Sequence, residues 1–217
     1  MKQILCFGDS NTWGLNAETG TRFPWEERWT GVLQEKLQGR DIRVIEEGLC
    51  GRTTIFEDPF RIGRRGTELL PTLLETHTPD AIVLMLGTND CKTYNHASAD
   101  RIGKGIEKLI QQIRKADPAI DILLVSPIEL GEDVWKPGFD LEFDQHSVKV
   151  SKQLKQTYLK IAWKYGCDFL AASDVAKPSK ADMEHMNEKG HKNLAKAIES
   201  FLVEKERNHS NNYVNVV

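Results

Sequence analysis

Several features that would assign a protein to a specialised class are scarce or absent in these 217 residues. No apolar run approaches the ~20 residues that a membrane-spanning helix needs. The formal net charge of −3 gives no basic excess for binding nucleic acid or an anionic membrane. None of the four cysteines lies in a C-x-x-C pair, which argues against a zinc site. With no signal-peptide cleavage region either, we expect a globular protein in the reducing cytoplasm, without a metal.

Short apolar runs alternate with amphipathic segments along the chain. The runs predict five strands, near residues 4–7, 42–45, 81–86, 120–125 and 168–170. The amphipathic segments predict helices over residues 25–37, 67–74, 102–113, 150–161 and 187–202. Pro71 is expected to disturb the second of these helices or to mark its start. Residues 129–145 show no clean periodicity, and we interpret them as a loop over the site.

This alternation predicts an α/β fold in which helices wrap a parallel sheet. Five strands with right-handed crossovers favour a flavodoxin-like strand order. The length suits one large domain, which we assign to residues 1–207, and residues 208–217 are expected to form a frayed C-terminal tail.

The first strand ends at a serine. Gly8, Asp9 and Ser10 interrupt the apolar run with turn residues, so the Ser10 hydroxyl is presented at the carboxyl edge of the sheet, where ligands of open α/β sheets bind. A serine needs a base to become a nucleophile. His185 is the candidate base, and Asp182 lies one turn earlier, where it can orient the other ring nitrogen. Ser10, Asp182 and His185 therefore form a candidate catalytic triad.

Two further segments follow apolar runs and can converge at the same edge. They are residues 48–54, which contain Gly51, and residues 87–90, which contain Asn89. The tetrahedral intermediate of ester cleavage carries negative charge on the former carbonyl oxygen. The backbone N–H groups of Ser10 and Gly51 and the side-chain amide of Asn89 are candidate donors to it, since glycine allows a close backbone approach.

Each of these motifs also has a purely structural interpretation. Gly8-Asp9-Ser10 could be a plain turn, and Asp182 could simply precede a helix. The occurrence of all these motifs together, in this order along the chain, favours a catalytic role over a purely structural one. The pocket candidates are Trp13 and Trp135, although tryptophans serve more often as core or interface anchors.

Other charged residues near these motifs have simpler interpretations. Asp9 and Asp90 are expected to hydrogen-bond within their own loops. The basic cluster Arg52, Arg61, Arg64 and Arg65 is expected to be a solvated surface or a subunit contact rather than a binding site for an acidic substrate.

Ser10, Gly51, Asn89 and His185, with Asp182 before the histidine, resemble the SGNH (GDSL-type) hydrolases in type and order, over roughly residues 2–202. The blocks 8–14, 48–54 and 87–92 look closest to the arylesterase/acyltransferase subgroup. The resemblance implies a three-layer α/β/α sandwich, no cofactor and a homo-oligomer. It also implies hydrolysis of short-chain or aryl esters through an acyl-enzyme on Ser10, with acyl transfer to alcohols as a further activity.

Two positions depart from the subgroup pattern: Glu46 stands where asparagine is usual, and Cys50 where serine is frequent. We expect these neighbours to alter loop shape and substrate range.

Two alternative functions stay open. A carbohydrate O-acetyl esterase would use the same residues, whereas a non-catalytic flavodoxin-like binding module would bind phosphate at Ser10, Asn11 and Thr12. The lack of a glycine-rich phosphate loop counts against the binding module.

Overall fold

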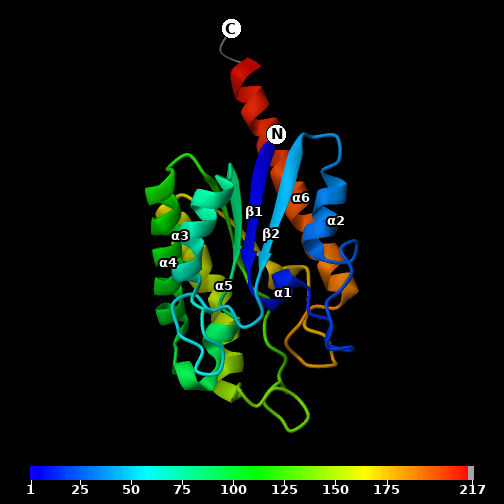
Figure 1. Ribbon diagram of the computed structural model, residues 1–217, viewed down its shortest axis with the longest axis vertical. Coiled ribbons are helices and arrows are strands. Elements are labelled where there is room, and N and C mark those ends of the chain that lie inside the picture. Colours follow the sequence, from blue (N-terminus) through cyan, green and yellow to red (C-terminus); the bar gives the residue numbers. More distant parts are fainter. Residues whose placement is uncertain (215–217) are drawn as a thin grey trace.

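A computed structural model describes the backbone of residues 1–214 and the side chains of residues 1–205. Its centre is one parallel sheet in the order β2-β1-β3-β4-β5, which confirms the predicted flavodoxin-like order (Figure 1). The strands are β1 (Lys2–Gly8), β2 (Ile42–Gly48), β3 (Ala81–Met85), β4 (Asp121–Ser126) and β5 (Asp168–Ala171).

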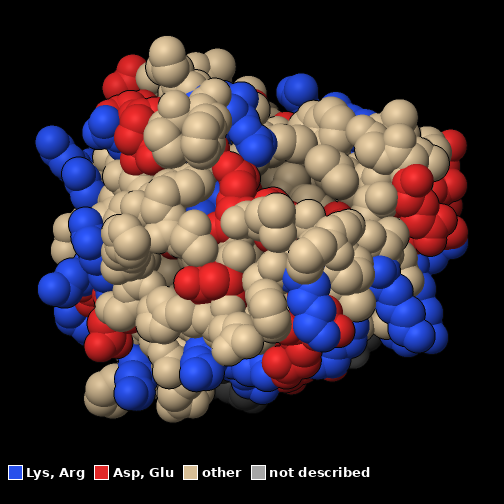
Figure 2. All heavy atoms as spheres, turned by 90° about the horizontal axis from the view of Figure 1, so that it is seen from below, with Lys and Arg blue, Asp and Glu red and all other residues tan. Residues whose placement is uncertain are grey.

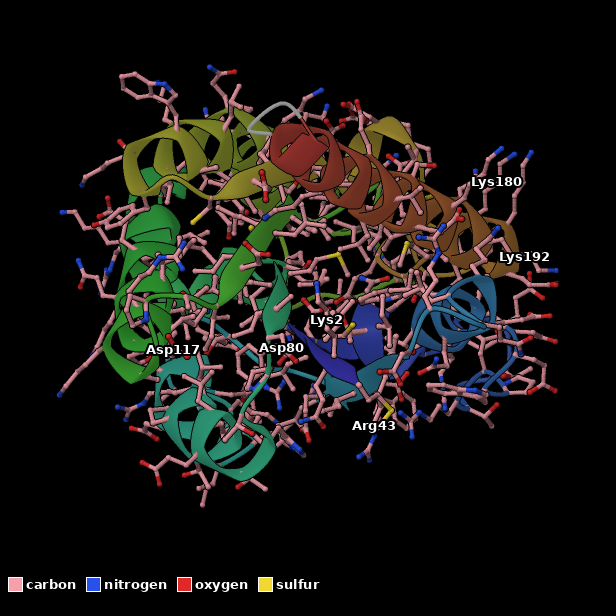
Figure 3. All side chains as sticks on the ribbon, turned by 90° about the horizontal axis from the view of Figure 1, so that it is seen from above. Lys2, Arg43, Asp80, Asp117, Lys180 and Lys192 are labelled. Carbon is pink, nitrogen blue, oxygen red and sulfur yellow. The ribbon has the colours of Figure 1, made fainter. Side chains whose placement is uncertain are left out.

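Helices cover both faces of this sheet and complete the three layers (Figures 1 and 3). The α-helices are α1 (Ser10–Trp13), α2 (Trp29–Lys36), α3 (Gly66–His77), α4 (Ala99–Ala116), α5 (Gln145–Tyr165) and α6 (Glu188–Val214). Short 3-10 helices are η1 (Asn89–Cys91), η2 (Thr93–Asn95) and η3 (Ala172–Asp174). Helices α3, α4 and α5 pack on one face, and α2 and α6 pack on the other.

The helix boundaries differ from the sequence prediction in several places, and α4 and α5 extend beyond the predicted residues at both ends. The helix expected over 25–37 begins only at Trp29, because the residues after Pro24 form a turn whose N–H groups bond to the Pro24 carbonyl. The segment expected to be a frayed tail, 208–217, is helical as far as Val214, and residues 215–217 lie outside the described residues. No helix in the described part of the chain is both long and apolar enough to cross a membrane.

Pro71 lies inside α3 without ending it. A proline cannot donate the hydrogen bond that the carbonyl of Thr67 would receive in a regular helix. The side-chain amide of Gln112 in α4 donates to that carbonyl instead, at 2.7 Å. The helix therefore continues to His77, three residues beyond the predicted end.

The strands are apolar on both faces because both faces are buried. In β1, Leu5 and Phe7 point into the cluster under α3, α4 and α5, whereas Ile4 and Cys6 point into the cluster under α2 and α6. All four side chains are at most 4% exposed. This burial explains why the strands appear in the sequence as continuous apolar runs rather than as alternating patterns.

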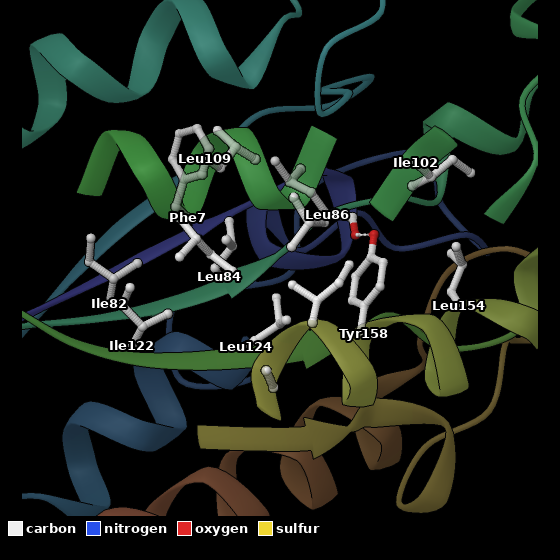
Figure 4. Packing of buried hydrophobic residues seen from close by; sticks show 14 of the residues in the cluster. Phe7, Ile82, Leu84, Leu86, Ile102, Leu109, Ile122, Leu124, Leu154 and Tyr158 are labelled. Atoms are coloured by element: carbon white, nitrogen blue, oxygen red, sulfur yellow. Dashed lines mark hydrogen bonds between the residues drawn. The ribbon is translucent and has the colours of Figure 1, made fainter. Parts of the chain in front are cut away.

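Tyr158 links the larger core to the end of β3. Its hydroxyl donates to the carbonyl of Leu86 at 2.8 Å, so a fully buried polar group is satisfied (Figure 4). The next residue, Gly87, has φ +130°, and a Cβ there would lie 2.4 Å from the tyrosine oxygen. The chain thus leaves β3 along a fixed path toward Asn89.

Candidate active site

The carboxyl ends of the strands face one end of the molecule, at the bottom of Figure 1. Figure 2 shows this end, which is hollowed near its middle, with Asp and Glu side chains beside the hollow. The loops after β1, β2 and β3 meet the segment that precedes α6 here. Ser10, Gly51 and Asn89 are therefore brought to one edge of the sheet, as their places after apolar runs predict, and His185 joins them from the segment before α6.

Ser10 is the first residue of α1, directly after the turn that ends β1. The Asp9 carboxylate accepts a hydrogen bond from the N–H of Asn11 at 3.0 Å and caps this short helix. A Cβ on Gly8 would lie 2.0 Å from Oγ1 of Thr12, so the tight turn has no room for a side chain. The Ser10 hydroxyl lies 2.7 Å from Nε2 of His185.

Asp182 holds the other side of the His185 ring. The distance from its Oδ2 to Nδ1 of His185 is 2.5 Å, and its Oδ1 accepts the backbone N–H groups of Glu184 and His185 at 3.0 Å. When Nδ1–H donates to this carboxylate, Nε2 is left to accept the proton of the Ser10 hydroxyl. The geometry is that of a nucleophile, a base and an orienting acid.

The electrostatic surroundings favour a proton on His185. Burial lowers the pKa of the imidazole, but the carboxylates of Glu184, Asp182 and Asp9 outweigh burial, so the pKa stands above its usual value. Burial raises the pKa of Asp182, but the hydrogen bond and charge of His185 outweigh it and lower that pKa below the usual range. These surroundings therefore favour a charged imidazolium at His185, as a base that accepts a serine proton would require.

The hydrogen-bond donors expected for the oxyanion lie on the other side of Ser10, and each has an N–H free to donate. The backbone N–H groups of Ser10 and Gly51 donate to no acceptor among the described residues. Gly51 has φ +81°, a conformation that L side chains rarely adopt. The Asn89 side chain gives one amide hydrogen to the carbonyl of Arg52 at 3.1 Å, which leaves its second hydrogen for a ligand.

Comparison with known proteins agrees with this arrangement. The profile of the GDSL-like lipase/acylhydrolase family matches residues 6–192. The chain belongs to this family. It is also similar to an arylesterase of Vibrio mimicus, with 35% identity over 91 residues. That match spans 41% of this chain and only 38% of the Vibrio protein.

Solved structures resemble this GDSL-type chain over nearly its whole length. A carbohydrate acetylesterase family member from Sinorhizobium meliloti is 38% identical, with a TM-score of 0.87, over 93% of this chain and 97% of that one. The native aryl esterase of M. smegmatis is 35% identical, also with a TM-score of 0.87, over 94% and 99% of the two chains. A putative arylesterase from Agrobacterium tumefaciens is 31% identical, with a TM-score of 0.85, over 94% and 99%.

Arg52 fixes the loop of Gly51 against β1 in this GDSL-type site. Its guanidinium donates to the carbonyl of Gly8 at 2.8 Å and to that of Glu47, and it lies over the ring of Phe7. Arg52 is 3% exposed, so the expectation that it belongs to a solvated basic surface is wrong. Burial lowers the pKa of this guanidinium to about 10, partly offset by Glu47.

Two further bonds connect the remaining loops. Both oxygens of Asp90 accept the N–H of Thr54 at 3.0 Å, which ties the Asn89 loop to the Gly51 loop. The expectation that Asp90 bonds within its own loop is therefore wrong, whereas the same expectation for Asp9 is confirmed by its bond to Asn11. Oδ1 of Asn11 accepts the N–H of Met186 at 2.9 Å and ties the Ser10 turn to the His185 segment.

The two departures from the subgroup pattern have different surroundings. Glu46 forms ion pairs with Arg22 and Arg28 and accepts a hydrogen bond from Thr30, so it anchors the chain between α1 and α2. Cys50 is a free thiol, half-buried beside Gly51. Within the part of the chain whose side chains are described, no three His, Cys, Asp or Glu residues are grouped to hold a metal ion.

The candidate pocket tryptophans are held by contacts outside the triad. The guanidinium of Arg22 lies 4.9 Å from the ring of Trp13, and Trp135 packs against the larger core and donates Nε1–H to the Glu132 carbonyl. Their role in a pocket stays a prediction.

The segment between β4 and α5, predicted as a loop, contains neither helix nor strand. The N–H of its Gly131 donates to the carbonyl of Met183 at 2.8 Å.

One acidic residue at the site was not predicted. The carboxylate of Glu184 lies 3.8 Å from Nε2 of His185, the nitrogen that faces Ser10. Burial raises the pKa of Glu184 to about 7, although the charge of His185 opposes this. Its position next to His185 in the sequence was the available signal.

Proposed function

We propose that the protein is a serine esterase that cleaves short-chain or aryl carboxylic esters. The observation that carries this proposal is the chain of contacts from the Ser10 hydroxyl to Nε2 of His185, at 2.7 Å, and from Nδ1 to Asp182, at 2.5 Å. The Ser10 oxygen attacks the ester carbonyl while Nε2 takes its proton. The C–O bond to the alcohol then breaks, and Nε2–H returns the proton to the departing oxygen.

The intermediate needs donors for its negatively charged oxygen. The N–H groups of Ser10 and Gly51 and the free amide hydrogen of Asn89 supply them in this proposal. The second half-reaction repeats the same proton transfers, with water in place of the departing alcohol. Its products are the carboxylic acid and the free Ser10 hydroxyl.

The substrate class rests on the similar structures, which include aryl esterases and a carbohydrate acetylesterase family member. An acetylated sugar is therefore the second candidate substrate, with the same catalytic residues. Rates on 4-nitrophenyl acetate and on acetylated monosaccharides, compared at equal enzyme concentration, separate the two. A higher kcat/KM on the sugar would assign the protein as a carbohydrate O-acetyl esterase.

Replacing the nucleophile tests the proposal. Ser10→Ala is expected to lower kcat on 4-nitrophenyl acetate by about 10⁴ or more. Ser126→Ala is the matched control, because Ser126 is also buried and its hydroxyl has no partner among the described residues. Full activity in Ser10→Ala would refute the proposal.

We also propose a cytoplasmic location and a homo-oligomer. The four unpaired cysteines support a reducing compartment. Exposed apolar side chains support subunit contacts, above all Ile62 and Trp163, which are 93% and 88% exposed. Light scattering of the purified protein measures the oligomeric state.

A further inference from the structure

Glu184 gives the reacting nitrogen a second acidic neighbour. The residue is 6% exposed, and its carboxylate accepts no hydrogen bond from the described residues. Asp182 already orients the ring through Nδ1, so orientation does not require Glu184. Its place beside Nε2 puts it where the water or alcohol of the second half-reaction must bind, because that molecule gives its proton to the same nitrogen.

The 3.8 Å gap between Oε1 of Glu184 and Nε2 of His185 fits one bridging oxygen. Two hydrogen bonds of ordinary length, about 2.8 Å each, span such a gap when they meet at roughly a right angle. A water molecule has two hydrogens to use in this way. One hydrogen points at Nε2 and is transferred during attack, and the other is donated to the Glu184 carboxylate.

An alcohol cannot make the same pair of bonds. Its single O–H is needed by Nε2, so its alkyl group would face the buried carboxylate. We propose that Glu184 positions the attacking water and biases the acyl-enzyme toward hydrolysis rather than transfer to simple alcohols. This inference rests on the proposed function, since it concerns the acyl-enzyme on Ser10.

The step is balanced. The water oxygen forms a bond to the acyl carbon, one water proton passes to Nε2, and the carbonyl π electrons move to the oxygen held by the donors. When the intermediate collapses, the carbon–Ser10 Oγ bond breaks and Nε2–H returns its proton to Oγ. Glu184 accepts a hydrogen bond throughout and exchanges no proton.

Four charged groups influence the ionisation of Glu184. They are His185 and Lys92, which favour the carboxylate, and Asp140 and Asp182, which oppose it. With burial, they place the pKa of Glu184 at about 7. The carboxylate is therefore formed as the pH rises through neutrality, and the preference for water strengthens over the same range.

The experiment measures the ratio of butyl acetate to acetate formed from 4-nitrophenyl acetate and 1-butanol. Glu184→Leu is expected to raise this ratio by roughly tenfold, the effect of losing one hydrogen bond to a charged group. The control Glu188→Leu removes an exposed carboxylate paired with Lys192 and is expected to leave the ratio unchanged.

Glu184→Gln keeps the shape of the side chain and provides a test even if Glu184→Leu fails to fold. The transfer ratio of the parent protein is expected to fall as the pH rises from 6 to 8, whereas the ratio of Glu184→Gln is expected to be independent of pH. A parent ratio that does not change with pH, or the same slope in both proteins, would overturn the inference. So would an unchanged ratio in folded Glu184→Leu.

The failure of this inference is distinct from that of the proposed function. All ratios are measured on activity that Ser10→Ala abolishes. Activity that survives in Ser10→Ala refutes the esterase mechanism itself, and the Glu184 inference fails with it. Ser10-dependent activity with an unchanged ratio refutes the role of Glu184 alone.

Discussion

The two sides of the site are held in place by different kinds of interaction. The loops after β1, β2 and β3 are joined by buried hydrogen bonds, among them those of Arg52 to Gly8 and of Thr54 to Asp90. The segment over residues 127–144 is joined to its surroundings partly through Glu142, which pairs with Lys92 and Arg61. Lys92 is buried, but Glu142 and Arg61 are 26% and 41% exposed, whereas Arg52 and Asp90 are both almost fully buried.

This difference suggests that the residues proposed for catalysis are held more firmly than those expected to select the substrate. A hydrogen bond to a buried charged group contributes about 1.5–3 kcal/mol, while an exposed ion pair contributes about 0–1 kcal/mol. The loops that carry the proposed oxyanion donors, at Ser10, Gly51 and Asn89, are therefore firmly held, as oxyanion stabilisation would require. The partly exposed pair of Arg61 with Glu142 can rearrange at lower cost, so we expect this part of the 127–144 segment to affect substrate range.

The largest effect is expected within the buried network. Asn89→Ala removes one donor to the oxyanion and should lower kcat by about 10²–10³, with a smaller change in KM. Steady-state kinetics on 4-nitrophenyl acetate measure both constants. Asn193→Ala, which removes an exposed amide bonded to Val175, is the control. A kcat within threefold of the parent would remove Asn89 from the proposed oxyanion hole.

Replacing Arg52 tests how much the same buried network contributes to the stability of the fold. Arg52→Leu leaves the carbonyls of Gly8 and Glu47 without their buried donor, and we expect the free energy of unfolding to fall by about 2–4 kcal/mol. Urea denaturation measures this change. Arg65→Leu is the control, because Arg65 is 40% exposed and its ion pairs with Glu57 and Glu68 lie at the surface. Equal losses in the two variants would contradict the comparison.

The pH dependence of activity tests the electrostatics of His185. The base must be neutral, so kcat/KM falls as the pH drops through the pKa of His185, which its acidic neighbours raise. Glu184→Gln removes one of these carboxylates and should lower that pKa, so the acid limb of the profile moves to lower pH. The corresponding change at exposed Glu188 should not move it. A limb that stays in place or moves upward in Glu184→Gln would contradict this assignment.

The smallest effect on the chemistry is expected at the partly exposed side chain of Arg61. Arg61→Gln breaks the contacts with Glu142 and Asp58 and should change kcat on 4-nitrophenyl acetate by less than about threefold. The relative rates across acyl chains of increasing length should change instead. A large loss of kcat on every ester would show that Arg61 contributes to catalysis itself. It would then weaken the contrast between the buried loops and the 127–144 segment.

The fold was predictable because its signals are local. Burial of both faces makes each strand a short apolar run, and the turn residues after β1 place Ser10 at the sheet edge. Asn187 precedes the last helix, a position that favours a capping asparagine, and its side chain accepts the N–H of Gly190 at 3.0 Å. Helix starts were less predictable, since the turn after Pro24 delays α2 although the apolar spacing begins earlier.

The long-range contacts of the site were not predictable. Arg52 lies in a basic cluster of the sequence, and only the packing of β1 against its loop shows that it is buried. Asp90 reaches Thr54, 36 residues away, although an aspartate in a loop usually bonds locally. The role inferred for Glu184 depends on the distance from its carboxylate to Nε2 of His185, and adjacency in the sequence does not determine that distance.

The central claim is that His185 makes the Ser10 oxygen the nucleophile, and covalent labelling tests it most directly. The protein is incubated with a 4-nitrophenyl phosphonate, and the modified peptide is identified by mass spectrometry. We predict one adduct per chain, on Ser10, with labelling slowed by at least about 10²-fold in His185→Ala. An adduct on another residue with Ser10 unmodified, or labelling of Ser10 at the parent rate in His185→Ala, would contradict the mechanism.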